Sequence, residues 1–220
     1  MAEILKGAPV AAALDVKTAE AVKALRARGI TPTLGILRVG ERPDDLAYER
    51  AAVKRCDKLG IATKLVTLPV DVMQGALLAK IAGLNSDPGV HGVLMFRPLP
   101  AQLDEREACE ALIPAKDVDG ITSGSAAALY TGSGDGFAPC TAEAVVALLE
   151  HYGIELSGKN AAVVGRSLVI GRPVSMLLMG RNATVTICHT KISLMGTGGL
   201  HPPRRYSRRR AGQGGISGCG

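Results

Sequence analysis

We expect an α/β protein with parallel sheets from this sequence, because apolar runs of strand length alternate with segments of helical periodicity. A second observation is the stretch 163–173, in which β-branched residues lead through two glycines toward a helix start. A third is the turn-rich stretch 130–139, which separates two such α/β patterns. The sequence therefore predicts an N-terminal α/β domain over 1–139 and a second α/β domain over 140–191.

The elements expected in the first domain are bounded by residues that start or stop regular structure. Pro32 and Gly40 bound a buried strand at 33–39. Asp44 or Asp45 caps a helix that ends at Gly60. The elements expected after this strand are a helix at 44–59, a strand at 62–68, a helix at 72–84, a strand at 92–96 and a helix at 104–112.

The second domain repeats the alternation over a shorter length. Thr141 is the expected cap of a helix at 141–152, with Glu143 in its first turn. A strand at 160–164, a helix at 173–180 and a strand at 183–189 follow. Pro173 suits the first turn of its helix, since its φ angle is already set near the helical value.

Composition excludes several classes of protein. No apolar run reaches the roughly 18 residues of a membrane span, and Asp15 interrupts the short apolar run at 8–14, so we expect neither a membrane segment nor a signal peptide. The five cysteines lack metal-ligand or disulfide spacing. We therefore expect a cytoplasmic protein without a metal site. The cysteines are Cys56, Cys109, Cys140, Cys188 and Cys219.

The segment 192–220 differs from the rest of the chain. It holds eight glycines and five arginines but no acidic residue, and it has no helical or strand period. Such a composition is typical of a GC-rich frame translated out of register, so we expect a frameshift near codon 191; a native disordered basic tail is the alternative. Nucleic-acid binding would rest on Arg204 to Arg210 with Tyr206 as the one aromatic residue, and we expect no nucleic-acid partner.

The stretch 163–173 has the chemistry of a phosphate-binding turn. Gly165 and Gly171 let backbone N–H groups approach pyrophosphate oxygens, and the helix start adds partial positive charge. Ser167 and Ile170 stand where the second and third glycines of the common dinucleotide motif would be. Arg166 suits a ribose 2′-phosphate, which favours NADP over NAD. A purely structural strand–turn–helix corner is the alternative.

Two carboxylates lie close together in the sequence Lys116-Asp117-Val118-Asp119-Gly120. Such a pair can bind a metal or accept hydrogen bonds from an amidine-like edge, although two ligands without a histidine make a poor metal site. An Asx-type turn is the structural alternative. Tyr48 lies on the helix expected at 44–59 and is a candidate functional residue; the alternative is that its ring only packs against the protein.

Motifs along residues 1–191 together resemble those of one enzyme family. They are Val39-Gly40 before the run to Tyr48, Pro98-Leu99-Pro100, the Lys116–Gly120 segment, Pro139-Cys140-Thr141, Val164-Gly165-Arg166-Ser167 with Gly171-x-Pro173, and His189-Thr190-Lys191. In order and spacing they resemble the bifunctional methylenetetrahydrofolate dehydrogenase/cyclohydrolase family.

The resemblance implies a homodimeric cytosolic enzyme of one-carbon metabolism, with an N-terminal tetrahydrofolate domain and a Rossmann-type NADP-binding domain. It implies oxidation of 5,10-methylenetetrahydrofolate by NADP, followed by hydrolysis to 10-formyltetrahydrofolate. Carried onto this sequence, Tyr48 stacks near the pterin and the reactive carbon, and Asp119 pairs with the pterin amidine edge. The implied cofactor-binding residues are Gly165, Arg166, Ser167, Gly171 and Thr190.

Two positions depart from the family pattern. Ala52 replaces the lysine expected one helical turn after Tyr48, and Phe96 replaces a glutamine, with Arg97 following it. Both family residues act in water addition, so we expect the dehydrogenase step to survive better than hydrolysis. Lys54 is the nearest lysine and a candidate catalytic replacement for the family lysine. It lies about 240° around the helix from Tyr48. The alternative is that Lys54 is a solvated surface residue.

Two further expectations concern the end of the chain. Family members continue after the His189–Lys191 segment with more strands, helices and a glycine-rich loop. We therefore expect an incomplete Rossmann domain with open strand edges, weak cofactor affinity and poor solubility. An inactive, truncated folate-binding remnant is the alternative function.

Overall fold

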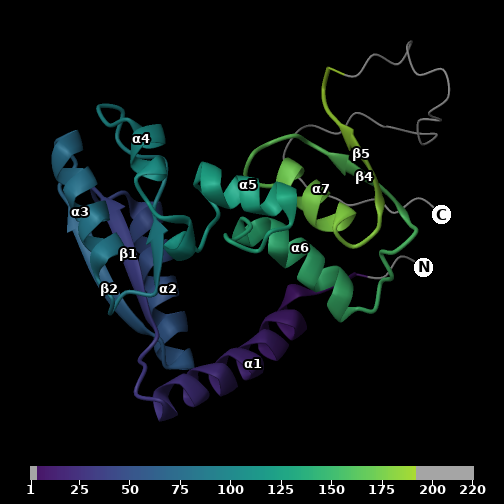
Figure 1. The fold of residues 1–220 in the computed structure, drawn as a ribbon, viewed down its shortest axis with the longest axis horizontal. Coiled ribbons are helices and arrows are strands. Elements are labelled where there is room, and N and C mark those ends of the chain that lie inside the picture. The colour runs from purple at the N-terminus through teal and green to yellow at the C-terminus, as the bar shows by residue number, and fades with distance from the viewer. Residues whose placement is uncertain (1–3, 192–220) are drawn as a thin grey trace. The chain divides into compact units, whose positions relative to one another are not determined.

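The computed structural model describes residues 4–191, which fall into two compact units divided between Cys140 and Thr141 (Figure 1). Each unit combines parallel strands with helices, so the predicted α/β fold class is confirmed. The frameshifted or disordered tail and the arginine cluster predicted within 192–220 lie outside the described residues.

The sheet of the first unit has the order β2–β1–β3, with both neighbours parallel to the central strand. The strands are β1 (Thr33–Val39), β2 (Ala62–Leu68) and β3 (Gly92–Met95). β1 is the central strand, and its last five residues, Arg38 among them, are all buried, in agreement with the predicted buried strand. The carboxyl ends of the three strands therefore meet at one edge, and the loops that follow them start there.

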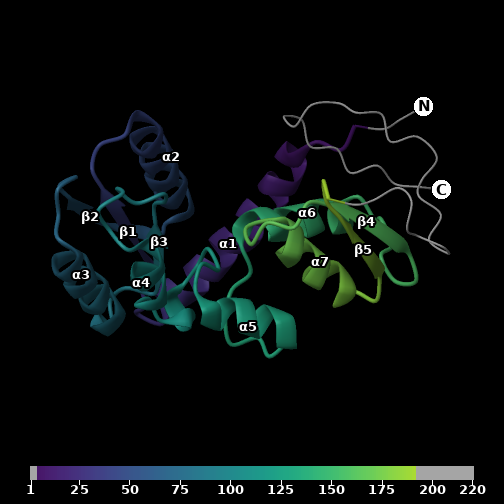
Figure 2. The same cartoon turned by 90° about the horizontal axis from the view of Figure 1, so that it is seen from above.

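Helices cover both faces of this sheet. α2 (Pro43–Leu59) and α3 (Gln74–Ser86) lie on opposite faces (Figure 2). Leu37 and Val39 of β1 pack with Leu77 and Ile81 of α3. Ile36 and Arg38 alternate with them and so point to the opposite face.

The ends of α2 and α3 differ from the predicted ones. Arg42 is the residue that precedes α2, and it makes no side-chain cap; Asp44 and Asp45 lie in the first turn, where their charges favour the helix dipole. The predicted aspartate cap was therefore wrong, because Pro43 already starts the helix. Gly60 ends α2 with a φ of 76°, as predicted. α3 begins at Gln74, two residues later than expected.

Two helices were not predicted. α1 (Gly7–Ala27) buries only Val10 and Val22, so it lacks the apolar stripe that reveals a helix in a sequence. α5 (Ser123–Thr131) is rich in alanine and serine and runs into the stretch that we expected to consist of turns. The remaining elements of the unit are α4 (Glu105–Glu110), capped by Asp104, and the short 3₁₀ helix η1 (Pro114–Lys116).

The second unit is described from Thr141 to Lys191, with its first helix starting at the boundary. Its elements are α6 (Cys140–His151), β4 (Asn160–Val164), α7 (Gly171–Met179) and β5 (Thr184–Cys188). β4 and β5 are parallel neighbours. α6 starts at Cys140, so Thr141 lies inside the helix and is not its cap, contrary to expectation. Pro173 is the third residue of α7, within the first turn as predicted.

One face of the β4–β5 pair carries the core of this unit (Figure 1). Ala161, Val163 and Val185 on the strands pack toward apolar residues of α6 and α7. On the other face Val164 is 56% exposed and Ala162 is exposed as well. Within the part of the chain that the structure describes, no helix has the length and hydropathy needed to cross a membrane.

Candidate functional site

Two aromatic rings meet beyond the carboxyl edge of the first sheet. Tyr48 projects from the first half of α2, and Phe96 follows β3 directly. Their ring centroids are 5.2 Å apart with an interplanar angle of 44°. Phe96 is 6% exposed, whereas Tyr48 is 58% exposed. The tyrosine therefore rests on a buried ring and keeps much of its own surface accessible to solvent.

The surroundings of Tyr48 raise the pKa of its hydroxyl above the ordinary value. The largest cause is partial burial, followed by the negative charge of Asp119 and then by Cys140. Tyr48 is thus a protonated hydroxyl at neutral pH. The electrostatic influence also places Asp119 and Cys140 near this ring, although they follow it by more than 70 residues in the sequence.

The two carboxylates of the predicted pair have different roles. Asp117 is fully buried and accepts hydrogen bonds from Ile121 N at 3.0 Å, from Thr122 N at 2.8 Å and from Ser125 Oγ at 2.7 Å. Its oxygens are therefore used within the protein, and the structural alternative, a side chain that organises a turn, is correct for Asp117.

Lys116 fixes the same loop from its other side. Its ammonium group donates to the carbonyls of Leu84, Asn85 and Asp87 at 2.7–2.9 Å. These carbonyls lie at the carboxyl end of α3, where helical carbonyls lack partners and a positive charge is favoured. Lys116 and Asp117 together hold the loop against α3 and α5.

Asp119 is presented by this fixed loop. It is half-buried and accepts one weak hydrogen bond from Cys140 N, at 3.4 Å. Gly120 has a φ of 61°, and a Cβ there would lie 2.6 Å from the carbonyl oxygen of Phe137. Only glycine fits this turn. Of the two carboxylates, Asp119 is therefore the one with acceptor capacity left for a ligand, and it lies near Tyr48.

The structure does not bring Lys54 to Tyr48. Lys54 is exposed on α2 and lines a shallow hollow of about 310 Å³ that Tyr48 does not border. The hollow is lined by Glu49, Arg50, Val53, Lys54, Asp57 and Leu65. A catalytic role for Lys54 thus stays a prediction without geometric support.

Two other basic side chains near α2 and β3 already have partners. Arg55, which shares the Tyr48 face of α2 more closely than Lys54, pairs with Asp15 of α1 at 2.5 Å. Arg97 lies 3.7 Å from Glu105. Ala52, one turn after Tyr48, is half-buried. Both arginines are therefore engaged with carboxylates, and neither is a ready substitute for a lysine one turn after Tyr48.

Sequence reasoning missed two features of this site. The sequence does not show that Phe96 is the partner of Tyr48, or that Cys140 lies beside Asp119. The available signal was topological: Phe96 follows one strand of a parallel sheet and Tyr48 lies on the helix after its neighbour, and the carboxyl ends of such strands meet at one edge.

The second unit contains the predicted glycine turn. Gly165 follows β4 with a φ of 136°, and its N–H donates to the carbonyl of Cys188 at 2.8 Å. A Cβ on Gly171 would lie 2.4 Å from the carbonyl oxygen of Gly165. The two glycines therefore pack backbone against backbone, and this close approach leaves no room for a side chain at position 171.

Ser167 organises the same turn. Its hydroxyl oxygen accepts from the N–H groups of Ile170 at 3.1 Å and Gly171 at 3.3 Å, at the start of α7. This arrangement is a local side-chain cap. Ser167 is nevertheless exposed to solvent.

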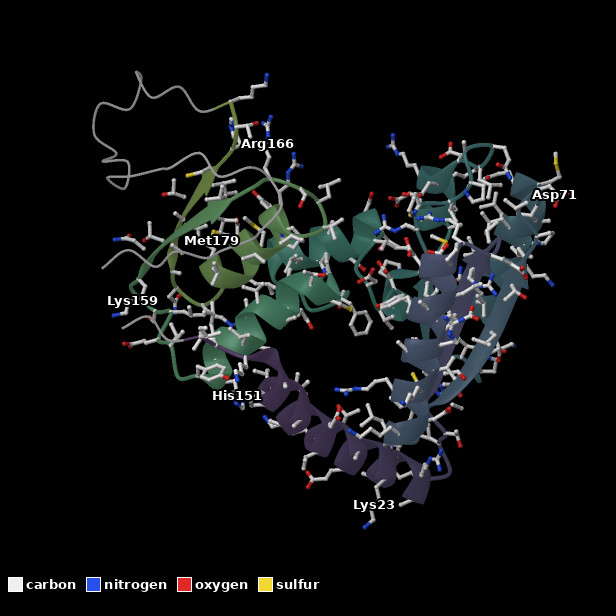
Figure 3. The ribbon with its side chains drawn as sticks, turned by 180° about the vertical axis from the view of Figure 1, so that it is seen from behind. Lys23, Asp71, His151, Lys159, Arg166 and Met179 are labelled. Atoms are coloured by element: carbon white, nitrogen blue, oxygen red, sulfur yellow. The ribbon has the colours of Figure 1, made fainter. Side chains whose placement is uncertain are left out.

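The charge around the turn favours an anionic ligand. Residues 156–191 contain no Asp or Glu, and Arg166, Arg172 and Thr190 are all exposed. Figure 3 shows Arg166 at one end of the β4–β5 pair and Lys159 at the opposite end. NAD-binding turns use an acidic residue about 20 residues after the glycines to hold the ribose 2′-hydroxyl. Here that place is occupied by Cys188-His189-Thr190-Lys191, which suits a 2′-phosphate.

Among residues 4–191, no three His, Cys, Asp or Glu side chains are grouped so that they could hold a metal ion. The described residues contain two candidate sites. One is the Tyr48–Phe96–Asp119 group of the first unit, and the other is the glycine turn of the second.

Comparison with known proteins also divides the chain into two domains. Residues 5–119 match the family model of the tetrahydrofolate dehydrogenase/cyclohydrolase catalytic domain, and residues 139–197 match that of its NAD(P)-binding domain. Bifunctional protein FolD of Alkaliphilus oremlandii is 46% identical over 191 residues, which cover 87% of this chain and 67% of the relative. FolD 1 of Desulfitobacterium hafniense is 48% identical over 192 residues, covering 87% and 68%.

Solved structures agree with the sequence matches. The bifunctional FolD enzyme of Campylobacter jejuni superposes with a TM-score of 0.83 at 35% identity, covering 86% of this chain and 67% of that one. The Trypanosoma brucei dehydrogenase-cyclohydrolase, solved with NADP and an inhibitor, gives a TM-score of 0.78 at 34% identity, covering 86% and 64%. The chain spans about two thirds of the length of these relatives.

The different roles of the paired carboxylates predict different effects on stability. Asp117→Asn turns one acceptor of a buried group into a donor that faces another donor, and we expect a loss of about 2–3 kcal/mol in the free energy of unfolding. Asp119→Asn, two residues away in the same loop, should cost less than about 0.5 kcal/mol. Urea unfolding followed by circular dichroism measures both, and equal losses would contradict the assignment.

Proposed function

Because the chain belongs to the tetrahydrofolate dehydrogenase/cyclohydrolase family, we propose that it oxidises 5,10-methylenetetrahydrofolate to the 5,10-methenyl form with NADP. The observation that carries this proposal is Asp119, a carboxylate with free acceptor capacity near an accessible tyrosine ring. We assign residues 1–139 to the folate-binding domain and 140–191 to part of the NADP-binding domain.

Folate recognition follows from the chemistry of the first site. The pterin ring is planar, and its amidine edge presents two N–H donors side by side, which a carboxylate accepts in a bidentate manner. Asp119 supplies the carboxylate. The exposed face of Tyr48 supplies a surface on which a planar ring stacks. An aromatic surface and an anionic acceptor are thus available within one unit of the protein.

The second site fits NADP. The close contact of Gly165 with Gly171 keeps side chains away from the turn, so a pyrophosphate can approach its backbone closely. Arg166 and Thr190 are the residues that we propose for the 2′-phosphate, and Ser167 holds the turn in shape. When bound, NADP supplies the hydride acceptor.

Hydride transfer does not require a titratable side chain. A hydride leaves the methylene carbon with the electron pair of its C–H bond, and the product is a delocalised methenyl cation; no proton is removed. The protein contributes by orienting two bound ligands. Tyr48, which stays neutral, and the apolar Ala52 and Phe96 are compatible with this step.

Water addition is the step that this chain performs less well, in our proposal. Adding water to the methenyl carbon releases a proton, which needs an acceptor in the site. Ala52 and Phe96 offer no titratable or hydrogen-bonding side chain, and Arg97 is paired with Glu105. We therefore propose that this chain shares the dehydrogenase activity of the family and has a weakened cyclohydrolase activity.

The cellular setting is proposed from the same family. Among residues 4–191, Cys56, Cys109 and Cys188 are free thiols, which supports the proposal of a reducing cytoplasm. A homodimer is proposed by analogy with the family alone. An inactive folate-binding remnant is the less favoured alternative, since both family domains are represented in the chain.

The proposal predicts that the full chain reduces NADP in the presence of 5,10-methylenetetrahydrofolate. In Asp119→Asn the amide presents a donor to the pterin edge, and we expect kcat/KM to fall about 100-fold because charge-assisted hydrogen bonds are lost. Asp57→Asn, on the exposed side of α2, is the matched control and should behave as the wild type. NADPH absorbance measures the rate; full activity in Asp119→Asn would overturn the assigned role.

Arg166 is expected to set the cofactor preference. Arg166→Ala removes the cation proposed to meet the 2′-phosphate, so KM for NADP should rise about 10-fold while KM for NAD stays unchanged. Lys159→Ala removes the same charge at the opposite end of β4 and serves as the control (Figure 3). If NADP and NAD were affected equally, the 2′-phosphate would not be the group that Arg166 contacts.

The weakened water addition predicts a gain of activity. The double variant Ala52→Lys with Phe96→Gln introduces an ammonium group and an amide beside Tyr48, and we expect hydrolysis of 5,10-methenyltetrahydrofolate to rise at least about 10-fold at saturating substrate. Decay of methenyl absorbance gives the rate, with Val53→Lys as the control for an added lysine on α2. Wild-type hydrolysis as fast as its dehydrogenase step would refute the proposal.

A further inference from the structure

Tyr48 has few neighbours that hold its ring. It is 58% exposed on α2, and a tyrosine on a helix surface ordinarily samples more than one side-chain rotamer. Ala52, one turn further along the helix, offers only a methyl group to pack against it. α2 by itself therefore does little to fix the orientation of the ring.

Phe96 has the opposite properties. Its backbone N–H donates to the carbonyl of Leu37 at 2.9 Å, which ties it to the central strand β1. It follows Met95 of β3 without a break, and its side chain is 6% exposed. A ring that is held by the sheet and surrounded by protein has one available position.

The contact between the two rings has an attractive geometry. A centroid separation of 5.2 Å and a tilt of 44° lie within the range in which aromatic pairs attract each other beyond simple burial. Because Phe96 is fixed, this attraction acts on Tyr48 and selects one of its rotamers. The exposed surface of Tyr48 then stays available for another planar ring.

We propose that Phe96 is a positioning residue, whose buried ring holds Tyr48 in the orientation that stacks on the bound folate. Phe96 thereby provides from β3 the support that Ala52 cannot provide from α2. This inference rests on the proposed function, since it names the ligand that Tyr48 meets. The charged or titratable groups near the Tyr48 hydroxyl, Asp119 and Cys140, belong to the same site.

The first test needs no folate. The full chain is labelled with 3-fluorotyrosine, and the Tyr48 resonance is assigned by its loss in Tyr48→Phe. In Phe96→Leu we expect this resonance to shift and sharpen, because the neighbouring ring and the single orientation are lost. Met95→Leu, a buried change one residue earlier, should leave it in place. Phe96→Met, which is longer and still apolar, provides a second variant if Phe96→Leu folds poorly.

The second test measures turnover. In Phe96→Leu and Phe96→Met, KM for 5,10-methylenetetrahydrofolate should rise about 2- to 10-fold, the range expected for one aromatic contact, while kcat changes less than about 2-fold. KM for NADP should stay constant. A Tyr48 resonance that is unchanged in both variants would overturn the positioning role. If the Tyr48 resonance shifts in the Phe96 variants but the wild-type chain neither binds nor oxidises the folate, the proposed function is overturned and the positioning of Tyr48 by Phe96 is not.

Discussion

The buried carboxylate of Asp117 is the constraint on which the first site depends. It lies fully inside the protein, where an unsatisfied charge would be costly, and three donors from the start of α5 and the residues before it compensate that cost. The backbone of Asp117 also forms an isolated parallel bridge with Val93 of β3, which ties the loop to the sheet at this point. Because Asp117 is fixed in this way, Asp119 two residues later has a defined position without being buried itself.

A second polar contact fixes the helix that carries Tyr48. Arg38 of β1 is buried and pairs with Glu49 of α2 at 2.8 Å, and it also donates to the carbonyl of Gly40. A buried ion pair adds little net stability, but it disfavours arrangements in which either charge loses its partner. The pair therefore favours the observed register of α2 against β1. Since Tyr48 precedes Glu49 directly, this register determines where the tyrosine leaves the helix.

The strands are the elements that the sequence predicted best, because their burial is visible as runs of apolar residues along the chain. The strands 33–39, 62–68 and 160–164 have the predicted limits because apolar runs and their flanking residues determine strands locally. α1 and α5 were not predicted because they lack an apolar stripe. The expected caps at Asp44 and Thr141 were wrong because a cap can be assigned only when the first residue of the helix is known, and the sequence does not define it that closely. Asp117 and Asp119 are equivalent in the sequence, and only their neighbours in space distinguish them.

The same site has to serve two reactions with opposite requirements. Hydride removal creates a delocalised cation and needs an aligned planar ligand, so aromatic contacts and exclusion of water favour it. Water addition consumes that cation and needs a polar group that positions water and receives its proton. Ala52 lies on α2 and Phe96 directly follows β3, and both residues are apolar. In the function that we propose, each replacement changes the balance in the same direction, toward binding and oxidation and away from hydrolysis, while the buried contacts of Asp117 and Arg38 keep the remaining geometry.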